Sequence, residues 1–385
     1  MRRVTYDLPQ LRATEFPWAD SRIWLDHASI GPLPERTRRA LEETIGRRCR
    51  PYELGAADQF GGLARCRAAI AGLIGAEAEE IALATNTSFG LAIAARALPL
   101  TPGDVVLVSD REFPANVYPW RRLGDRGVRC EMVPVTPEGW PDEARLIERL
   151  HAPEVRAIAV SLTQFASGYT VDLARLSSLT RQLGKWLVVD AIQGVGQLPV
   201  DLRATPVDIL ACGAQKWLLS PWGSGFLYVR QPLIAQLDPA ITGWMNFEGT
   251  DDFTRLTEYR DALRADARRF ELITLPFQEF VALNQSLALL AELGIAAIQA
   301  HLAVLQEQLL AWADRRGVAV TSPRGVHGSG ITCLAPPRTA EAHAALRAAG
   351  IYCSLREGSL RISPHCYNTA AEIERVTEVL GQQLG

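Results

Sequence analysis

Lysine is nearly absent from this chain. Of its 385 residues, 40 are lysine or arginine, and only Lys185 and Lys216 among them are lysines. A coding preference for arginine explains the imbalance, but it does not explain which lysines were kept. Any mechanism that needs a lysine amine therefore has two candidates.

Other scarcities exclude whole classes of partner. No run of five or more lysines and arginines occurs, and 43 acidic residues bring the net charge to −3. Such a balance gives no electrostatic reason to bind nucleic acid. Uncharged apolar stretches are far shorter than the roughly 18 residues of a membrane-spanning helix. The first 15 residues lack the apolar core of a signal peptide. We expect neither a nucleic-acid partner nor a membrane.

Cysteine and histidine are also sparse and dispersed. The seven cysteines form no CxxC pair, and the six histidines form no HExxH motif or cluster with cysteine. An odd, scattered set of cysteines is typical of reduced thiols in a cytoplasm. We therefore expect a cytoplasmic location and no metal site.

The composition, 48% hydrophobic and 22% charged, is that of a globular protein. Between residues 83 and 230, short apolar runs alternate with amphipathic stretches. This order predicts a largely parallel sheet with helices on both faces. The expected strands are 104–109, 155–162, 186–191, 207–211 and 225–230, and the expected helices are 88–98, 116–126, 142–150 and 173–183.

The pattern changes after residue 230. An irregular, charge-rich segment, 243–269, precedes a second set of elements that predicts a smaller α+β domain. Its expected helices are 282–293, 298–315, 339–349 and 370–384, and its expected strands are 318–321, 331–335, 351–355 and 360–363. We expect an N-terminal arm over 1–20, a large domain over 21–270 and a small C-terminal domain over 271–385.

Two neighbouring strands end in residues that carry chemistry. One delivers Asp190, with Gln193 three residues later, and the next leads to Gln215 and Lys216. A carboxylate and an amine fixed at strand ends suit pyridoxal phosphate. The amine forms a Schiff base with the aldehyde, and the carboxylate keeps the ring nitrogen protonated. Burial also lowers the pKa of a lysine, which frees a nucleophilic amine near neutral pH.

With these residues the chain resembles the class V aminotransferase family of fold-type I pyridoxal-phosphate enzymes. This group includes cysteine desulfurases, isopenicillin N epimerase-like enzymes and C–S lyases. The resemblance covers nearly the whole chain and implies a large, mostly parallel, seven-stranded sheet domain with a smaller α+β C-terminal domain. Besides the lysine region, it rests on WLDHASIGPLP (24–34), TNTSFGL (85–91), EFPANVYPW (112–120), RFELITLP (269–276) and LRISPHCYNT (360–369).

The resemblance implies that Lys216 is the catalytic residue and that Asp190, Gln193 and Gln215 contact the cofactor. Thr87 and Ser88 would hold its phosphate at a helix N-terminus, where the helix dipole favours an anion.

Three further roles come from the same resemblance. Phe113 would stack on the ring, at a position where many relatives have a histidine. Thr274 would reach the phosphate of a neighbouring subunit, which implies a homodimer with a shared active site. Arg361 would bind the substrate α-carboxylate, because a guanidinium pairs with a carboxylate bidentately.

The loop before Arg361 departs from the desulfurases, which carry a nucleophilic cysteine there on a mobile segment. Residues 350–361 are too few for such a loop, Cys353 falls in an expected strand, and Cys366 lies beyond the nucleophile's usual position. We therefore predict an enzyme that removes the Cα proton of an α-amino acid with Lys216 and favours β-elimination of a carbon–sulfur bond. Epimerisation and transamination remain alternatives, as does a cofactor-binding protein without turnover.

Overall fold

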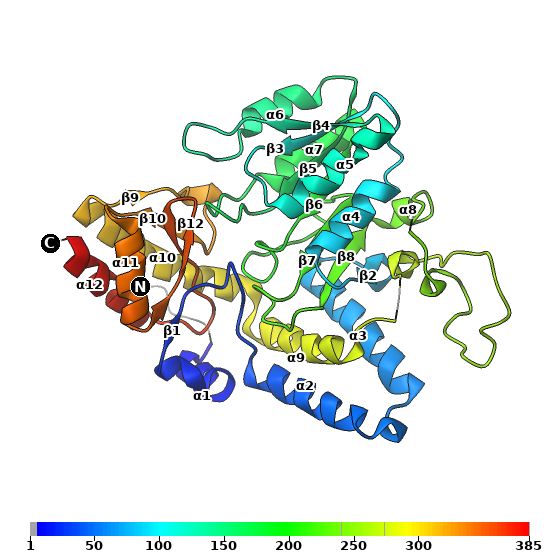
Figure 1. Ribbon diagram of the computed structural model, residues 1–385, viewed down its shortest axis with the longest axis horizontal. Coiled ribbons are helices and arrows are strands. Elements are labelled where there is room, and N and C mark those ends of the chain that lie inside the picture. Colours follow the sequence, from blue (N-terminus) through cyan, green and yellow to red (C-terminus); the bar gives the residue numbers. More distant parts are fainter. Residues whose placement is uncertain (1–5, 240, 273, 385) are drawn as a thin grey trace.

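A seven-stranded sheet lies at the centre of the computed structural model, which describes residues 6–239, 241–272 and 274–384 (Figure 1). Residues 1–5 of the predicted arm, 240 of the large domain, and 273 and 385 of the small domain lie outside the described residues. The strand order is β2-β8-β7-β6-β5-β3-β4. The strands are β2 (Ile81–Leu83), β3 (Val105–Ser109), β4 (Arg129–Val133), β5 (Val155–Ser161), β6 (Trp186–Asp190), β7 (Ile209–Gly213) and β8 (Gly225–Val229).

This sheet confirms the predicted large, mostly parallel, seven-stranded architecture. The strands β7, β6, β5, β3 and β4 run parallel, and β8 is antiparallel to both of its neighbours, β7 and β2. The sequence pattern predicted five of the seven strands. It missed the two edge strands because β2 has only three residues, and β4 is mostly only half-buried and shows no continuous apolar run.

Both faces of the sheet are buried, as the parallel arrangement requires. Along β5, Ala157 and Ala159 belong to one hydrophobic core, whereas Ile158 and Val160 belong to the other. Helices α4 (Thr87–Ala97), α5 (Tyr118–Arg122) and α8 (Gln231–Ile234) contribute to the first core, and α3 (Ala56–Ile74), α6 (Glu143–Leu150), α7 (Leu173–Leu183) and α9 (Phe277–Leu293) contribute to the second. The predicted helix 116–126 is reduced to α5 with a 3₁₀ turn on each side.

The C-terminal part forms a four-stranded antiparallel sheet with the order β12-β13-β10-β9. Its strands are β9 (Ala319–Val320), β10 (Thr332–Ala335), β12 (Ser354–Arg356) and β13 (Ser359–Ile362), and its helices are α10 (Ile295–Arg316), α11 (Thr339–Ala348) and α12 (Ala370–Leu384). The predicted strand 351–355 is wrong in one respect: it breaks at Cys353. Its first half, β11 (Ile351–Tyr352), pairs in parallel with β1 (Ile23–Trp24) instead of with β13.

The N-terminal segment therefore reaches the C-terminal part of the chain, as Figure 1 shows for β1. Helix α1 (Leu8–Glu15) precedes β1, and α2 (Glu35–Arg48) follows it and packs with α3 on α9. Segment 243–269 is irregular as predicted, with only the 3₁₀ turns Trp244–Asn246 and Ala267–Phe270 at its ends. The domain boundaries at 20 and 270 stay a prediction.

Within the described residues, no single helix is long and apolar enough to span a membrane. Helices α9 and α10 meet the length and composition criterion only when joined, and the chain bends by 74° between them.

Candidate active site

Asp190 and Lys216 come from the carboxyl ends of two paired strands. Strand β6 ends at Asp190, and it runs parallel to β7, which ends three residues before Lys216. The Asp190 carboxylate is 2% exposed and accepts a hydrogen bond of 3.1 Å from the amide of Ile192. Burial raises the pKa of Asp190 to about 6, and the nearby Lys216 charge opposes this rise.

The Lys216 amine is poised for chemistry near neutral pH. Burial lowers the pKa of Lys216 to about 8, Asp190 counteracts this shift, and the positive charge of Arg361 adds to it. An amine with this pKa is neutral in roughly one molecule in ten at pH 7. Lys216 is half-buried, and the direction of its pKa shift agrees with the sequence prediction.

Phe113 faces the lysine. Its ring centroid lies 5.6 Å from the Lys216 ammonium nitrogen, which is within the range of a cation–π contact. The ring is 42% exposed and packs edge-on against Phe165, with the centroids 5.2 Å apart. An exposed aromatic ring beside the amine can stack on a flat ligand.

The predicted phosphate site lies at the N-terminus of α4. The helix begins at Thr87, whose hydroxyl accepts a hydrogen bond of 2.8 Å from the amide of Gly213 at the end of β7. Ser88 follows in the first turn and is exposed. A Cβ on Gly213 would lie 2.5 Å from the Gln215 side-chain oxygen and 3.2 Å from the Thr87 hydroxyl. The absence of a side chain on Gly213 therefore lets Gln215 and Thr87 come close together beside a helix end that favours an anion.

Gln193 lies at the site but its amide is already engaged. It donates to the carbonyl of Ala28 (2.8 Å) and accepts from the indole of Trp217 (2.7 Å). Gln215 is half-buried, and its backbone carbonyl accepts from the amide of Gly31 (2.9 Å). Gln193 thus links the segment of Ala28 to the side chain of Trp217, and the backbone of Gln215 is tied to Gly31.

Arg361 is fully buried on β13. It donates to the carbonyl of Phe165 (2.8 Å), to the hydroxyl of Ser29 (2.6 Å) and to the carboxylate of Asp26 (3.2 Å). Its Nε–H is buried and has no acceptor within the described residues. The guanidinium therefore has at least one N–H without a partner among the described residues. Thr274, in contrast, is exposed.

Glu112 and Gln164 are residues of the site that the sequence did not single out. The Glu112 carboxylate accepts from the backbone amide of Ser161 and from the side chain of Gln164, both at 2.8 Å. Burial, together with the charge of Asp190, raises the pKa of Glu112 to about 7, and the hydrogen bonds from Ser161 oppose this rise. Its position directly before Phe113 in the EFPANVYPW motif was the available signal.

The second lysine corrects a sequence expectation. A glycine before Lys185 suggests a solvated lysine in a turn, but Lys185 is buried and donates to the carbonyls of Leu150 and Ala152 at the end of α6. A cation at a helix C-terminus is favoured by the helix dipole. Lys185 therefore has a structural role.

Comparison with known proteins decides the family. Residues 56–376 match the sequence profile described as aminotransferase class-V. The chain belongs to this family. A protein named probable cysteine desulfurase from Methanothermobacter thermautotrophicus is 29% identical over 99% of this chain and 98% of its own length. Isopenicillin N epimerase from Amycolatopsis lactamdurans is 28% identical over 94% of this chain and 98% of its own length.

Solved structures confirm the fold-type I architecture. The apo structure of cysteine desulfurase from Thermococcus onnurineus NA1 superposes with a TM-score of 0.86 at 22% identity, and it covers 100% of this chain and 99% of that one. The family member described here is a pyridoxal-phosphate-dependent enzyme. Its residues fit the cofactor: an amine, a buried carboxylate, an aromatic face and a helix N-terminus lie together at the strand ends.

Proposed function

We propose that this enzyme uses Lys216 to remove the Cα proton of an α-amino acid and then eliminates a β-substituent. The reaction we favour breaks a carbon–sulfur bond. The observation that carries the proposal is the Lys216 amine beside Phe113 at the strand ends. Its pKa of about 8 means that part of the enzyme has a neutral amine near neutral pH. A general base is most effective when its pKa lies near the working pH. Bound cofactor supplies an aldehyde for the lysine and a ring that accepts the electrons released at Cα.

The chain's own residues would hold that cofactor. Asp190 would keep the ring nitrogen protonated, since it is a buried carboxyl group with spare acceptor capacity. Thr87 and Ser88 would bind the phosphate at the start of α4, Gln215 would lie beside it, and Phe113 would stack on the ring. Gln193 would orient these groups through its two bonds to the surrounding chain.

Arg361 would bind the substrate carboxylate. Its buried Nε–H lacks an acceptor within the described residues, and an unpaired buried donor is costly until a ligand satisfies it. The substrate class that follows is an α-amino acid.

A homodimer in the cytoplasm completes the proposal. Thr274 is exposed, which suits a residue that reaches the phosphate site of a second copy. All seven cysteines, which lie within the described residues, are free, as expected in a reducing compartment.

Burial of the two cysteines nearest to Arg361 in the sequence, Cys353 and Cys366, argues against a sulfur-carrying desulfurase. Such a nucleophile needs an exposed thiolate. Cys353 is 7% exposed, and burial raises its pKa to about 12. Cys366 is fully buried, and burial raises its pKa as well. Only Glu357 and Gly358 connect β12 to β13, so no long loop precedes Arg361.

Epimerisation is the second candidate, supported by the 28% identical isopenicillin N epimerase. Inversion at Cα requires a proton to return to the face opposite the one that lost it. Phe113, at the stacking position, has no proton to give, which favours elimination from a single base. Transamination uses the same groups and is the third candidate.

A product assay separates these reactions. The purified enzyme is incubated with a panel of amino acids and cysteine conjugates in deuterated water. Pyruvate plus ammonia supports elimination. Recovered amino acid with deuterium at Cα and inverted configuration would contradict elimination and indicate epimerisation. Strict dependence on a keto acid would contradict elimination and indicate transamination.

A further inference from the structure

Three segments that are distant in sequence lie together next to Lys216: residues 27–31, 215–217 and 361–367. His365, in the third segment, hydrogen-bonds to the second. His365 is fully buried, and its Nδ1 accepts a hydrogen bond of 2.7 Å from the amide of Cys366. Because Nδ1 is an acceptor, a neutral imidazole carries its proton on Nε2. Nε2–H therefore donates to the backbone carbonyl of Trp217, at 3.0 Å. This carbonyl belongs to the residue that follows the lysine.

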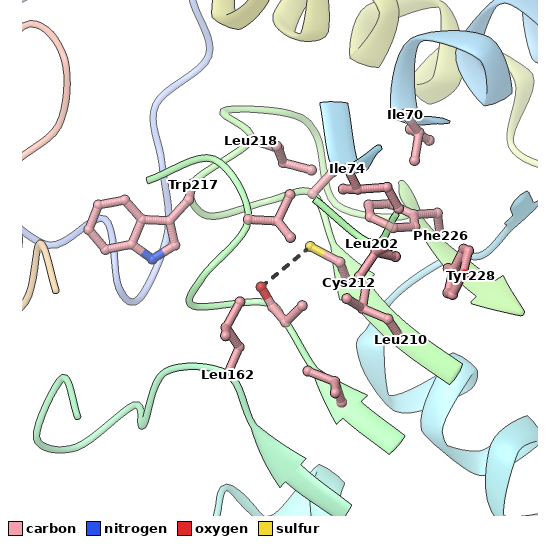
Figure 2. Close-up of a cluster of buried hydrophobic side chains, with 14 of the residues drawn as sticks. Ile70, Ile74, Leu162, Leu202, Leu210, Cys212, Trp217, Leu218, Phe226 and Tyr228 are labelled. Carbon is pink, nitrogen blue, oxygen red and sulfur yellow. Dashed lines mark hydrogen bonds between the residues drawn. The ribbon is translucent and has the colours of Figure 1, made fainter. Parts of the chain in front are cut away.

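The side chain of Trp217 is fixed as well. It is fully buried, its indole donates to Gln193 (2.7 Å), and its ring lies 5.5 Å from the His365 ring between centroids. Figure 2 shows the indole pointing away from the aliphatic cluster around Ile70 and Ile74. Trp217 is thus held at both its carbonyl and its indole.

The chain on the other side of the lysine is equally constrained. The amide of Gly31 donates to the carbonyl of Gln215 (2.9 Å), and a Cβ on Gly31 would collide with the carbonyl oxygen of Lys216. Gly196, at a φ of 103°, approaches the Trp217 carbonyl in the same way. Only glycine allows these close approaches, so the backbone from 215 to 217 is confined from several sides.

The segment that carries His365 also carries Arg361. Ser363 lies between them, and its carbonyl accepts from Nδ1 of His27 (2.8 Å) while its hydroxyl accepts from the amide of Ala28 (3.0 Å). Tyr367 donates to Nε2 of His27 (3.0 Å). The predicted carboxylate-binding arginine and the lysine backbone are therefore tied to one buried network.

We propose that His365 is a positioning residue: its bond to the Trp217 carbonyl sets where the Lys216 amine stands relative to a substrate held by Arg361. The inference rests on the proposed roles of Lys216 and Arg361. It assigns no proton transfer to His365. Misplacing a reacting group by about 1 Å can lower a rate by roughly a hundredfold, so a single backbone contact beside the base is sufficient to matter.

Charge at His365 plays no part in this role. Its pKa falls to about 4 through burial, and the titratable groups around it are His27 and His301. Protonation at Nδ1 would also turn an N–H toward the N–H of Cys366. The imidazole therefore stays neutral and acts as a fixed donor.

Two amide substitutions separate the two ring nitrogens. His365→Gln places a donor at the reach of Nε2 and keeps the bond to Trp217. His365→Asn keeps an acceptor near Nδ1 for Cys366 but is too short to reach the Trp217 carbonyl. We expect the Asn variant to lose about tenfold to a hundredfold in kcat, with KM within about twofold, and to shift the pH midpoint of the cofactor's visible absorbance band. The Gln variant should have the wild-type kcat and the wild-type absorbance midpoint.

His327→Ala is the matched control. His327 also bonds a backbone carbonyl, that of Thr170 at 2.9 Å, but it has no link to the lysine segment, so kcat and the absorbance midpoint should not change. A folded Asn variant with wild-type kcat and midpoint overturns the inference. If the Asn variant does not fold, the Gln variant decides. A folded Gln variant with lowered kcat and a shifted absorbance midpoint overturns the inference, and a Gln variant with wild-type kcat and midpoint supports it. If borohydride does not fix the cofactor to Lys216 in the wild-type enzyme, the proposed function itself is overturned.

Discussion

Arg361 and Asp26 form an ion pair of 3.2 Å with both side chains largely buried. The second carboxylate oxygen of Asp26 accepts from Ser354 at 2.7 Å, so the acid is held in place. Burial lowers the pKa of Arg361, and the Asp26 charge acts in the opposite direction. A substrate carboxylate would therefore meet a guanidinium whose charge is already partly compensated.

Removing the guanidinium should weaken substrate binding. Arg361→Ala should cost about 2–5 kcal/mol, because a buried charged hydrogen-bond partner is lost, and the loss should appear as a higher KM. Steady-state kinetics on the preferred amino acid measures it. An unchanged KM would place the carboxylate elsewhere. Asp26→Asn is the companion variant: with less compensation of the arginine charge, its KM should fall below the wild-type value.

Cofactor uptake should depend on pH through the lysine. Only the neutral amine condenses with an aldehyde, and the pKa of Lys216 is about 8. The rate at which cofactor-free enzyme binds pyridoxal phosphate should therefore rise about tenfold per pH unit below that value and level off above it. Stopped-flow absorbance follows this directly. Since Asp190 raises the pKa of Lys216, Asp190→Asn should move the midpoint to lower pH, and a midpoint near that of free lysine would contradict the burial argument.

Glu112 should make the folded state sensitive to pH. Its pKa rises from 4.5 to about 7 on folding, so its stabilising contribution is present below the unfolded value and is lost as pH rises through the folded value. Gln can keep the contacts to Ser161 and Gln164. The unfolding free energy of Glu112→Gln minus that of wild type should therefore be higher at about pH 8 than at about pH 5, by on the order of 3 kcal/mol.

Urea unfolding of the cofactor-free protein at the two pH values measures that difference. Glu112→Ala serves as the comparison, because it removes both the charge and the hydrogen bonds to Ser161 and Gln164 and should be destabilised at both pH values. A pH-independent difference between Glu112→Gln and wild type would show that the carboxyl group is ionised throughout.

The stacking role of Phe113 predicts a loss of cofactor affinity without loss of fold. Phe113→Ala should weaken cofactor binding by about 0.5–1.5 kcal/mol, the usual value of an aromatic stacking pair. Equilibrium titration of cofactor-free protein gives the dissociation constant. Tyr118→Ala, another exposed aromatic of the same motif, is the control and should bind normally. Equal affinity in the Phe113 variant and wild type would remove Phe113 from the site.

The sequence predicted the parts of this site that depend on local pattern. Asp190 and Lys216 meet because consecutive parallel strands end at the same edge of a sheet. The bond from Arg361 to Asp26 spans 335 residues, and that from His365 to Trp217 spans 148. No periodicity or capping signal encodes such pairings, because they arise only when segments far apart in the sequence come together in the fold. The burial of Lys185 was missed for a similar reason: its partners, the carbonyls of Leu150 and Ala152, lie 35 and 33 residues earlier in the chain.

Borohydride labelling tests the central claim most directly, since the chain has two lysines. The cofactor-loaded enzyme is reduced, digested and mapped by mass spectrometry, with Lys216→Ala treated in parallel. We predict that the cofactor is fixed to Lys216 alone and that the variant carries no label. Label on Lys185, or a reduced enzyme without label on either lysine, would contradict the assignment of Lys216 as the catalytic amine.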